Sequence, residues 1–449
     1  MKDSDRYDVI VAGGGVAGVA AAVTSARLGA RTLLVERYGF LGGMATAGLV
    51  NPFMSTSTSA GKLLVGGFFS EICNRISEMG GMLGRAFDPE VMKFCAQEMV
   101  LEAGSDLLLH SWVAGARVAE KEVIGIEVLT KSGPGEVDGT IIIDTTGDAD
   151  VAAMAGASYE IGNPDEDGMT QAMTLMFTIG GVYVGKALAY AKDNPNEMRF
   201  PKPSSDADLE IMLENAIGIA GFYKQVEEAR AKGEFPLQQD MVFFISLPTP
   251  GQVVVNTTHI CGMDGTQAED LTKAEIEGRR QVMALVKFFR KYIPGFENAY
   301  LLQTAAQVGV RETRRVKGEY VFNADDILAG SKFIDAIVRS AYPVDIHSPM
   351  GKGYTRDDES TPIAPPPGDW YEVPYRCLVP LEVDDLLVAG RCVSATHEAQ
   401  GAIRIMPTCM AMGQAAGTAA ALCVKEGVTP RTLNTALLRK HLIEQGAII

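Results

Sequence analysis

The first apolar runs of the chain, separated by glycines, predict a strand, a helix and a second strand. Tyr7–Ala12 is a short run rich in Val and Ile, and after a cluster of glycines an alanine-rich stretch continues to Leu28. A second apolar run covers Thr32–Val35. This order of strand, turn, helix and strand is typical of the start of a parallel sheet.

The pattern changes twice further along the chain. Apolar runs over residues 107–118, 123–129 and 141–144 predict strands, but from about Gly156 the chain becomes a mixture of polar loops and charged helical stretches. This middle part includes a predicted helix over 272–292 and a proline-rich loop over 362–367. A buried strand over 386–389 and a long helix over 407–426 then restore the first pattern. We therefore expect an α/β domain interrupted by an inserted domain.

Composition and charge exclude several classes of protein. The 449 residues carry a formal net charge of −16, which argues against a nucleic-acid partner. The seven cysteines include no close pair, which suits a reducing cytoplasm and argues against a dithiol reductase. The start has no signal-peptide pattern, and the apolar stretch 408–424 is too short for a membrane span. We expect a cytoplasmic protein that does not bind a membrane.

A dinucleotide-binding fingerprint lies between the first predicted strand and helix. Gly13, Gly15 and Gly18 have the spacing Gly-x-Gly-x-x-Gly, and Glu36 closes the next strand. The first glycine suits a tight turn, the second lets backbone approach a pyrophosphate, and the third lets helix and strand touch. Glu36 can accept hydrogen bonds from ribose hydroxyls. The alternative is a glycine-rich structural turn, which would not require the strand, helix and acidic residue in this register.

A second glycine doublet follows Glu36 and favours FAD over NAD. Residues 37–46 read Arg-Tyr-Gly-Phe-Leu-Gly-Gly-Met-Ala-Thr. A cofactor that continues past its pyrophosphate could lie along Gly42 and Gly43, whereas an NAD enzyme does not need such a segment. The alternative is a flexible surface loop.

Two more turns follow predicted strands. Thr146, Gly147 and Asp148 are small residues over which a cofactor could lie, although alone they indicate only a turn. Gly390 and Arg391 follow the strand over 386–389 in the same way.

The start of the last helix is the third place where a flavin could lie. Arg404 precedes Pro407, a residue that suits a first helical position. The unpaired N–H groups at a helix start carry a partial positive charge, which would stabilise the negative charge of a reduced flavin pyrimidine. The alternative is an alanine-rich helix that only packs.

These segments together resemble the FAD-dependent oxidoreductases of the glutathione-reductase superfold, in particular bacterial members of unassigned substrate. The resemblance covers residues 6–50, 141–157, 309–322 and 386–424, including Gly309-Val-Arg-Glu-Thr-Arg-Arg315 and Gly413-Gln-Ala-Ala-Gly417. It implies a Rossmann-like FAD-binding domain of glutathione-reductase type, divided into residues 1–157 and 378–449, and an inserted α+β substrate domain over 158–377. The flavin ring would lie at their junction.

The residues expected to bind FAD come from these motifs and from the predicted strand over 107–118. They are Gly13, Gly15, Val16, Ala17, Gly18, Glu36, Arg37, Gly42, Gly43, Met44, Ala45, Thr46, Val113, Thr146, Gly147, Asp148, Gly390, Arg391, Arg404, Met406 and Thr408. No metal site is expected.

The reaction is less constrained, because relatives of this fold catalyse many different reactions. No second glycine fingerprint with correct spacing is present, so a separate NAD(P)H domain is not expected. We expect hydride transfer between flavin N5 and a small polar molecule. A flavin monooxygenase is the alternative, although Gly390-Arg391 stands where such enzymes usually have Gly-Asp. A non-catalytic FAD-binding electron-transfer subunit is a third hypothesis, and a homo-oligomer is compatible with the sequence.

Hydride transfer needs a proton donor or acceptor and a grip on the substrate. Of the five histidines, His347 and His397 are the candidates, with a structural histidine as the alternative for each. Arg311 and Arg376 are candidates for binding substrate oxygens, with a structural ion pair as the alternative. Arg404 could serve either the substrate or the cofactor.

Overall fold

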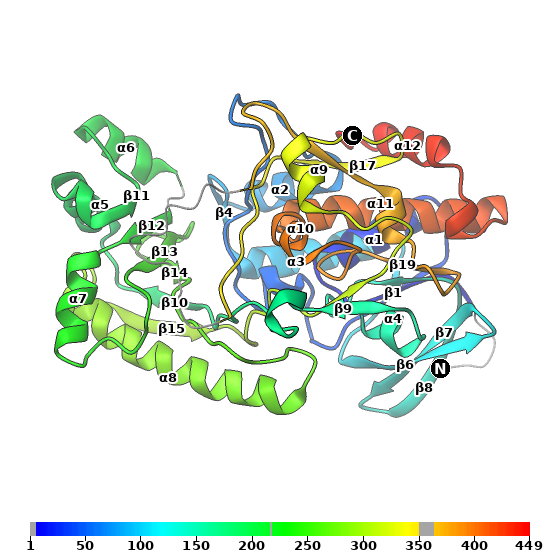
Figure 1. Cartoon of the computed structure of the whole chain (residues 1–449), viewed down its shortest axis with the longest axis horizontal. Helices are drawn as coiled ribbons and strands as arrows, with labels where there is room; N and C mark the ends of the chain where they lie inside the picture. The colour runs from blue at the N-terminus through cyan, green and yellow to red at the C-terminus, as the bar shows by residue number, and fades with distance from the viewer. Residues whose placement is uncertain (1–5, 216–217, 350–362) are drawn as a thin grey trace.

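The protein folds into a larger lobe, formed by the first and last parts of the chain, and a smaller lobe formed by its middle (Figure 1). The computed structural model describes residues 6–215, 218–349 and 363–449, so Pro362 of the proline-rich loop lies outside the described residues. None of the helices within those ranges combines the length and the apolarity needed to cross a membrane.

A parallel sheet forms the centre of the larger lobe. Its first strands are β1 (Tyr7–Ala12) and β2 (Thr32–Val35), joined by α1 (Val16–Arg27), as the sequence predicts. The strand order is β5-β2-β1-β8-β7-β6, where β8 covers Gly133–Asp144, and β19 (Leu386–Val388) also pairs with β8. Strands β5, β2, β1, β8 and β19 run parallel to their neighbours in this set. The last strand comes from the far end of the sequence, so this domain is split as expected.

The predicted strand over 107–118 is in fact two strands with different partners. Residue His110 has a φ of +53°, which interrupts the extended backbone between β5 (Asp106–Leu108) and β6 (Ser111–Ala119). The first pairs in parallel with β2. The second starts an antiparallel meander with β7 (Glu122–Thr130) and the first half of β8. The prediction of one continuous strand was therefore wrong.

The last long helix, α11 (Met406–Glu426), packs closely against α1 in the larger lobe (Figure 1). A Cβ atom on Gly413 would lie 2.1 Å from the carbonyl oxygen of Ala17, and one on Gly417 would lie 2.2 Å from that of Ala21. Only glycine at these two positions permits this approach.

The other elements of the larger lobe surround this sheet and helix pair. They are α2 (Phe68–Glu78), β3 (Met82–Leu83), β4 (Ala86–Phe87), α3 (Pro89–Glu102), α4 (Asp150–Met154), β9 (Tyr159–Ile161), β16 (Arg314–Val316), α9 (Ala324–Ala329), β17 (Ala336–Ser340), β18 (Tyr371–Pro374), α10 (His397–Ile403) and α12 (Thr435–Glu444). Short 3-10 turns lie at Gly43–Ala45, Pro164–Glu166, Pro195–Glu197, Tyr375–Leu378 and Pro430–Thr432.

The smaller lobe is an antiparallel sheet covered by helices. Its strand order is β11 (Met198–Phe200), β12 (Gly218–Gly221), β13 (Val242–Ser246), β14 (Val253–Val255), β10 (Phe177–Gly180) and β15 (Tyr300–Thr304). The helices are α5 (Val184–Asp193), α6 (Asp206–Glu214), α7 (Tyr223–Ala231) and α8 (Ala268–Tyr292). The buried residues Ala274, Gly278, Val282, Leu285 and Phe289 of α8 recur every three or four positions, so one face of this predicted helix packs on the lobe.

The buried apolar residues divide at a different place from the predicted domain boundary. The core of the smaller lobe draws its middle-segment residues from Met173 to Val310. Phe322, Ile337 and Tyr371, which lie within the predicted insertion over 158–377, pack instead with α1 and α11. We propose on this basis that the inserted domain ends near residue 310.

Candidate active site

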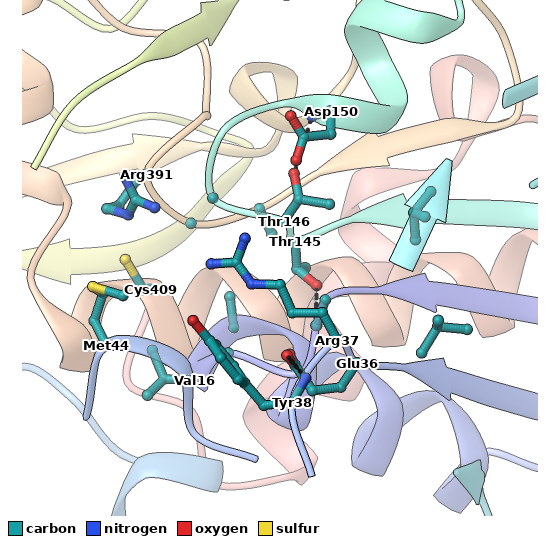
Figure 2. Close-up of a pocket in the computed structure, with 18 of the residues that line it drawn as sticks. Val16, Glu36, Arg37, Tyr38, Met44, Thr145, Thr146, Asp150, Arg391 and Cys409 are labelled. Carbon is teal, nitrogen blue, oxygen red and sulfur yellow. Dashed lines mark hydrogen bonds between the residues drawn. The ribbon is translucent and has the colours of Figure 1, made fainter. Parts of the chain in front are cut away.

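A cleft opens at the carboxyl ends of the parallel strands, where open α/β sheets bind their ligands. It encloses about 960 Å³, counting the part open to solvent. Figure 2 shows side chains from three segments around it: Glu36, Arg37 and Tyr38 after β2, Thr145, Thr146 and Asp150 after β8, and Arg391 after β19. Most of the residues expected to bind FAD line this cleft, namely Gly13, Gly15, Val16, Ala17, Glu36, Arg37, Met44, Val113, Thr146, Gly147, Gly390, Arg391, Arg404 and Met406.

The glycine turn after β1 has the geometry that the fingerprint predicts. Gly13 has a φ of +102°, and a Cβ atom on it would lie 2.7 Å from the carbonyl oxygen of Thr145. A Cβ atom on Gly18 would lie 1.8 Å from the carbonyl oxygen of Gly13, so this glycine supports the turn from behind the cleft. At Gly15 the nearest atom would be 3.9 Å away, which leaves open space for a ligand close to the backbone.

The Glu36 carboxylate is tied to the same turn. It accepts hydrogen bonds from the N–H of Gly14 at 2.6 Å and from the N–H of Tyr38 at 2.9 Å. Burial raises the pKa of Glu36, while these two hydrogen bonds act in the opposite direction. Glu36 lines the cleft, where the sequence predicts that it accepts from ribose hydroxyls.

The second glycine doublet packs against the first glycine turn. The N–H of Gly42 donates to the carbonyl oxygen of Gly14 at 2.8 Å. A Cβ atom on Gly43 would lie 2.7 Å from the Cα of Gly15. Ala45 is buried, and the Thr46 hydroxyl donates to the carbonyl oxygen of Leu41 at 2.7 Å. Of this segment only Met44 joins Arg37 and Tyr38 on the cleft, so Gly42, Gly43, Ala45 and Thr46 shape the turn from behind.

The turn after β8 is held by a buried acid. Asp144 accepts hydrogen bonds from the N–H of Thr146 at 3.0 Å, from its hydroxyl at 2.7 Å and from the N–H of Ala152 at 2.9 Å. Complete burial raises the pKa of Asp144 to about 6. Asp148 does not line the cleft, but its carboxylate accepts from Arg391 at 3.2 Å.

Three buried polar atoms near the start of α11 have no hydrogen-bond partner among the described residues. They are the Nη1 atoms of Arg391 and Arg404 and the Oγ1 atom of Thr408. Arg391 and Arg404 line the cleft, whereas Thr408 does not. The spare donor of Arg391, beside a glycine turn open to a ligand, fits a cofactor that carries phosphates, and the spare donor of Arg404 can serve either the cofactor or a substrate beside it.

Several residues on the cleft were not among those expected to bind FAD. They are Val35, Tyr38, Ser111, Trp112, Thr145, Asp150, Gln307, Ala389 and Cys409. The Arg37 guanidinium lies 5.1 Å from the Tyr38 ring centre and 5.0 Å from that of Trp112. Gln307, which reaches the cleft from the smaller lobe, accepts hydrogen bonds from both Arg37 and Tyr38. The signals available were the place of Tyr38 within the segment 37–46 and the place of Trp112 in the predicted strand that also contains Val113.

A family model described as FAD dependent oxidoreductase matches residues 8–442. The chain belongs to this family. Its cofactor is FAD, and the expected Rossmann-like fold of an FAD-dependent oxidoreductase is confirmed. A search of curated proteins finds no significant match.

Three solved structures align with most of this FAD dependent oxidoreductase at low identity. A geranylgeranyl bacteriochlorophyll reductase-like protein from Thermoplasma acidophilum covers 99% of this chain and 84% of its own, with 12% identity and a TM-score of 0.44. The p-nitrophenol 4-monooxygenase from Pseudomonas putida covers 95% of this chain and 82% of its own, with 11% identity and a TM-score of 0.45. The L-proline dehydrogenase from P. horikoshii covers 99% of this chain and 100% of its own, with 13% identity and a TM-score of 0.42. Likeness at this level does not indicate a reaction.

The two candidate histidines of this oxidoreductase have different surroundings. His397 is 4% exposed, and its Nδ1 lies 2.8 Å from Oε1 of Glu312, an acid that is fully buried and also bonded to buried Arg315. His347 lies on the segment between β17 and β18, with its Nε2 3.6 Å from Oδ1 of Asp345. Burial, reinforced by the charge of Arg311, lowers the pKa of His347 to about 4.

The two candidate arginines also differ. Arg311 donates to the carbonyl oxygen of Ala172 at 2.6 Å and to the hydroxyl of Thr174 at 2.8 Å, at the entry to the smaller lobe. Arg376 donates to the Asp335 carboxylate at 2.9 Å and lies 5.2 Å from the Tyr320 ring centre. The structure therefore brings Arg311 together with His347 and keeps Arg376 in a separate ion pair.

Proposed function

We propose that the chain transfers a hydride between flavin N5 of FAD and a small polar molecule held where the two lobes meet. The observation that carries this proposal is the contact between the end of the FAD cleft and the segment that bears His347. Arg404, which lines the cleft, donates to the carbonyl oxygen of Asp345 at 2.7 Å. A substrate beside the flavin would therefore meet a neutral imidazole and two guanidinium groups.

The residues that would hold FAD follow from the cleft. The open face of Gly15 and the spare Nη1 donor of Arg391 suit the pyrophosphate, and the start of α11 suits the pyrimidine. When bound, FAD supplies the hydride chemistry. The protein contributes the position of the substrate, the exclusion of water and the movement of a proton.

Within this proposal His347 moves the proton and Arg311 helps to bind the substrate. A neutral imidazole can accept a proton from a hydroxyl or amine as the hydride leaves. We place His397 and Arg376 outside the site: His397 bonds to Glu312, a fully buried acid that also pairs with Arg315, and Arg376 pairs with Asp335.

Anaerobic bleaching of the bound flavin by a panel of alcohols, amines, hydroxy acids and sugars tests the proposal. We expect at least one class to reduce the flavin in a single turnover, in the absence of any partner protein. Bleaching that requires a second protein would instead favour the electron-transfer subunit. Transfer of an isotopically labelled oxygen atom from O₂ into the product would favour a monooxygenase, for which Gly390-Arg391 is an unusual sequence.

A further inference from the structure

Five ionisable side chains gather at the junction of the lobes. Arg311 precedes β16, Arg404 ends α10, Asp345 and His347 lie between β17 and β18, and His259 follows β14. The charge of Arg311 lowers the pKa of His259, His347 and Asp345, and the charge of Arg404 lowers the pKa of Asp345 and His347. Ala172 contacts both Arg311 and the main chain of His347, and Arg404 contacts Asp345, so groups from separate parts of the chain lie close together. We call this set the junction cluster.

The junction cluster is fastened to both lobes. The N–H of His347 donates to the side-chain oxygen of Gln171 at 3.1 Å, and its carbonyl oxygen accepts from the N–H of Ala172 at 3.3 Å, at the entry to the smaller lobe. On the other side, the carbonyl oxygen of Asp345 accepts from Arg404, and a Cβ atom on Gly401 would lie 3.0 Å from the same oxygen. The main chain that carries the imidazole is thus held on both sides, and Asp345 lies 3.6 Å from the imidazole Nε2, which favours precise placement beside a reacting carbon.

The named groups of the junction cluster differ in their charge at pH 7. Burial, assisted by Arg311, lowers the pKa of His347 and of His259 to about 4, so both are neutral at pH 7. Burial would raise the pKa of Asp345, but His347 and the two arginines hold it well below its usual range. The junction cluster therefore combines two guanidinium groups and one carboxylate with two neutral imidazoles.

One of these guanidinium groups is buried with a donor to spare. The Arg404 side chain is 9% exposed, and its Nη1 has no partner among the described residues. The Nε2 atom of His259 is also buried without a partner among them. An unmade hydrogen bond on a buried charged group is costly, so a ligand that accepts from Arg404 gains this energy on binding.

We infer that the junction cluster anchors the carboxylate of a small acid that carries a hydroxyl or amino group on the adjacent carbon. This inference rests on the proposed function and names its substrate class. Arg404 and Arg311 bind the carboxylate oxygens, Asp345 positions His347, and His347 faces the hydroxyl or amine. The carbon between these two groups would then face the cleft that Arg404 lines.

The reaction balances with FAD as the only oxidant. In a 2-hydroxy acid the bond from the adjacent carbon to hydrogen breaks, and the hydride carries both electrons to flavin N5. The hydroxyl proton passes to the imidazole of His347, and the C–O single bond becomes a carbonyl. The products are a 2-oxo acid, reduced FAD and one proton, and an amino acid would give the corresponding imine.

Binding of acids that cannot be oxidised tests the anchor without turnover. The probe is 2-hydroxyisobutyrate, which lacks a hydrogen on the adjacent carbon, together with acetate, benzoate and oxalate, and each is compared with its neutral amide. Binding is followed by the change in the visible spectrum of the FAD-loaded protein. We expect at least one acid to bind tenfold or more tighter than its amide, because a carboxylate accepts charge-assisted hydrogen bonds from guanidinium groups that a neutral amide cannot match. If no acid binds more tightly than its amide, the anchor is wrong.

Two arginine variants and one control variant test whether the acid binds at the junction cluster. Arg311→Lys and Arg404→Lys should each weaken binding of the acid by about tenfold or more while retaining one FAD per chain, since lysine cannot bind a carboxylate as a fork. Arg376→Lys, in its separate ion pair, should bind the acid like the wild type. Unchanged binding in both site variants, or release of FAD from both, would overturn the assignment. The comparison of acid with amide in the wild type stands even if a variant fails to fold.

The anchor and the proposed function can fail separately. Tight binding of acids without bleaching by any hydroxy or amino acid would leave the anchor standing and refute the dehydrogenase. Bleaching by neutral alcohols or sugars alone would support the dehydrogenase and refute the carboxylate anchor.

Discussion

The FAD cleft and the junction cluster are built in contrasting ways. The cleft consists largely of backbone turns in which each glycine lies within a few residues of its neighbours in sequence, as at Gly13, Gly15 and Gly18. The junction cluster consists of single side chains from distant segments, such as His259 and Arg404. A turn can be recognised from a short motif, whereas a cluster of this kind exists only after folding. The cofactor site is therefore the generic part of the molecule, and the cluster is the part that can specify a substrate.

The largest effect is expected from filling the glycine turn. In Gly18→Val the new Cβ atom would lie 1.8 Å from the carbonyl oxygen of Gly13, so the turn must move away from the pyrophosphate position. We expect purified Gly18→Val to carry almost no flavin, measured as flavin absorbance per mole of protein. Gly135→Ala is the control, because its Cβ atom would meet only Val128 at 3.7 Å. Full flavin content in Gly18→Val would contradict our description of the cleft.

Substitution of His347, a member of the junction cluster, and of His397, which lies outside it, tests which histidine transfers the proton. His347→Gln should slow flavin reduction by about 100-fold to 10,000-fold, the usual contribution of a general base, without loss of FAD. His397→Gln should reduce the rate far less but lower the free energy of unfolding by about 2 kcal/mol, since it weakens a hydrogen bond to the buried Glu312. Anaerobic stopped-flow reduction and urea unfolding separate the two effects. A reversed pattern would move the proton transfer to His397.

The contrast between cleft and cluster also explains how much the sequence could predict. The strand, turn and helix of residues 7–35 and the helix α11 were predicted because apolar periodicity and glycine spacing are local. His347 and His397 could not be ranked, because the difference between them is the buried Glu312 beside one and the two arginines beside the other. Gln307 was missed because nothing near it in sequence indicates that it reaches Arg37.

The pH dependence of stability should reveal the buried acid beneath the cleft. Burial raises the pKa of Asp144 from 3.8 to about 6, so the folded state prefers the neutral acid. Its contribution is complete below about pH 3.8 and is lost as the pH rises through 6. The shift corresponds to about 3 kcal/mol. Relative to Asp144→Asn, which has no titrating group here, the wild type should lose this amount between pH 4 and pH 7 in urea unfolding. If the free energies of unfolding of the two proteins changed with pH in parallel, ionisation of Asp144 would not destabilise the fold.

The smallest effect concerns the point where the smaller lobe touches the FAD cleft. Among the described residues that line the cleft, Gln307 alone comes from that lobe, and it accepts hydrogen bonds from Arg37 and Tyr38. Both donors face solvent in part, so their loss of a partner is compensated by water, and Gln307→Ala should weaken FAD binding by only about 1 kcal/mol.

The same substitution should leave the junction cluster intact, because the Gln307 side chain bonds to Arg37 and Tyr38, which are not members of the cluster. Titration of the protein stripped of FAD with the cofactor, followed by flavin fluorescence, measures the first effect. Binding of 2-hydroxyisobutyrate to the reloaded protein measures the second. If Gln307→Ala weakened binding of the acid as much as binding of FAD, the two regions would be coupled through the lobe interface, and the distinction between a generic cleft and a specific cluster would not hold.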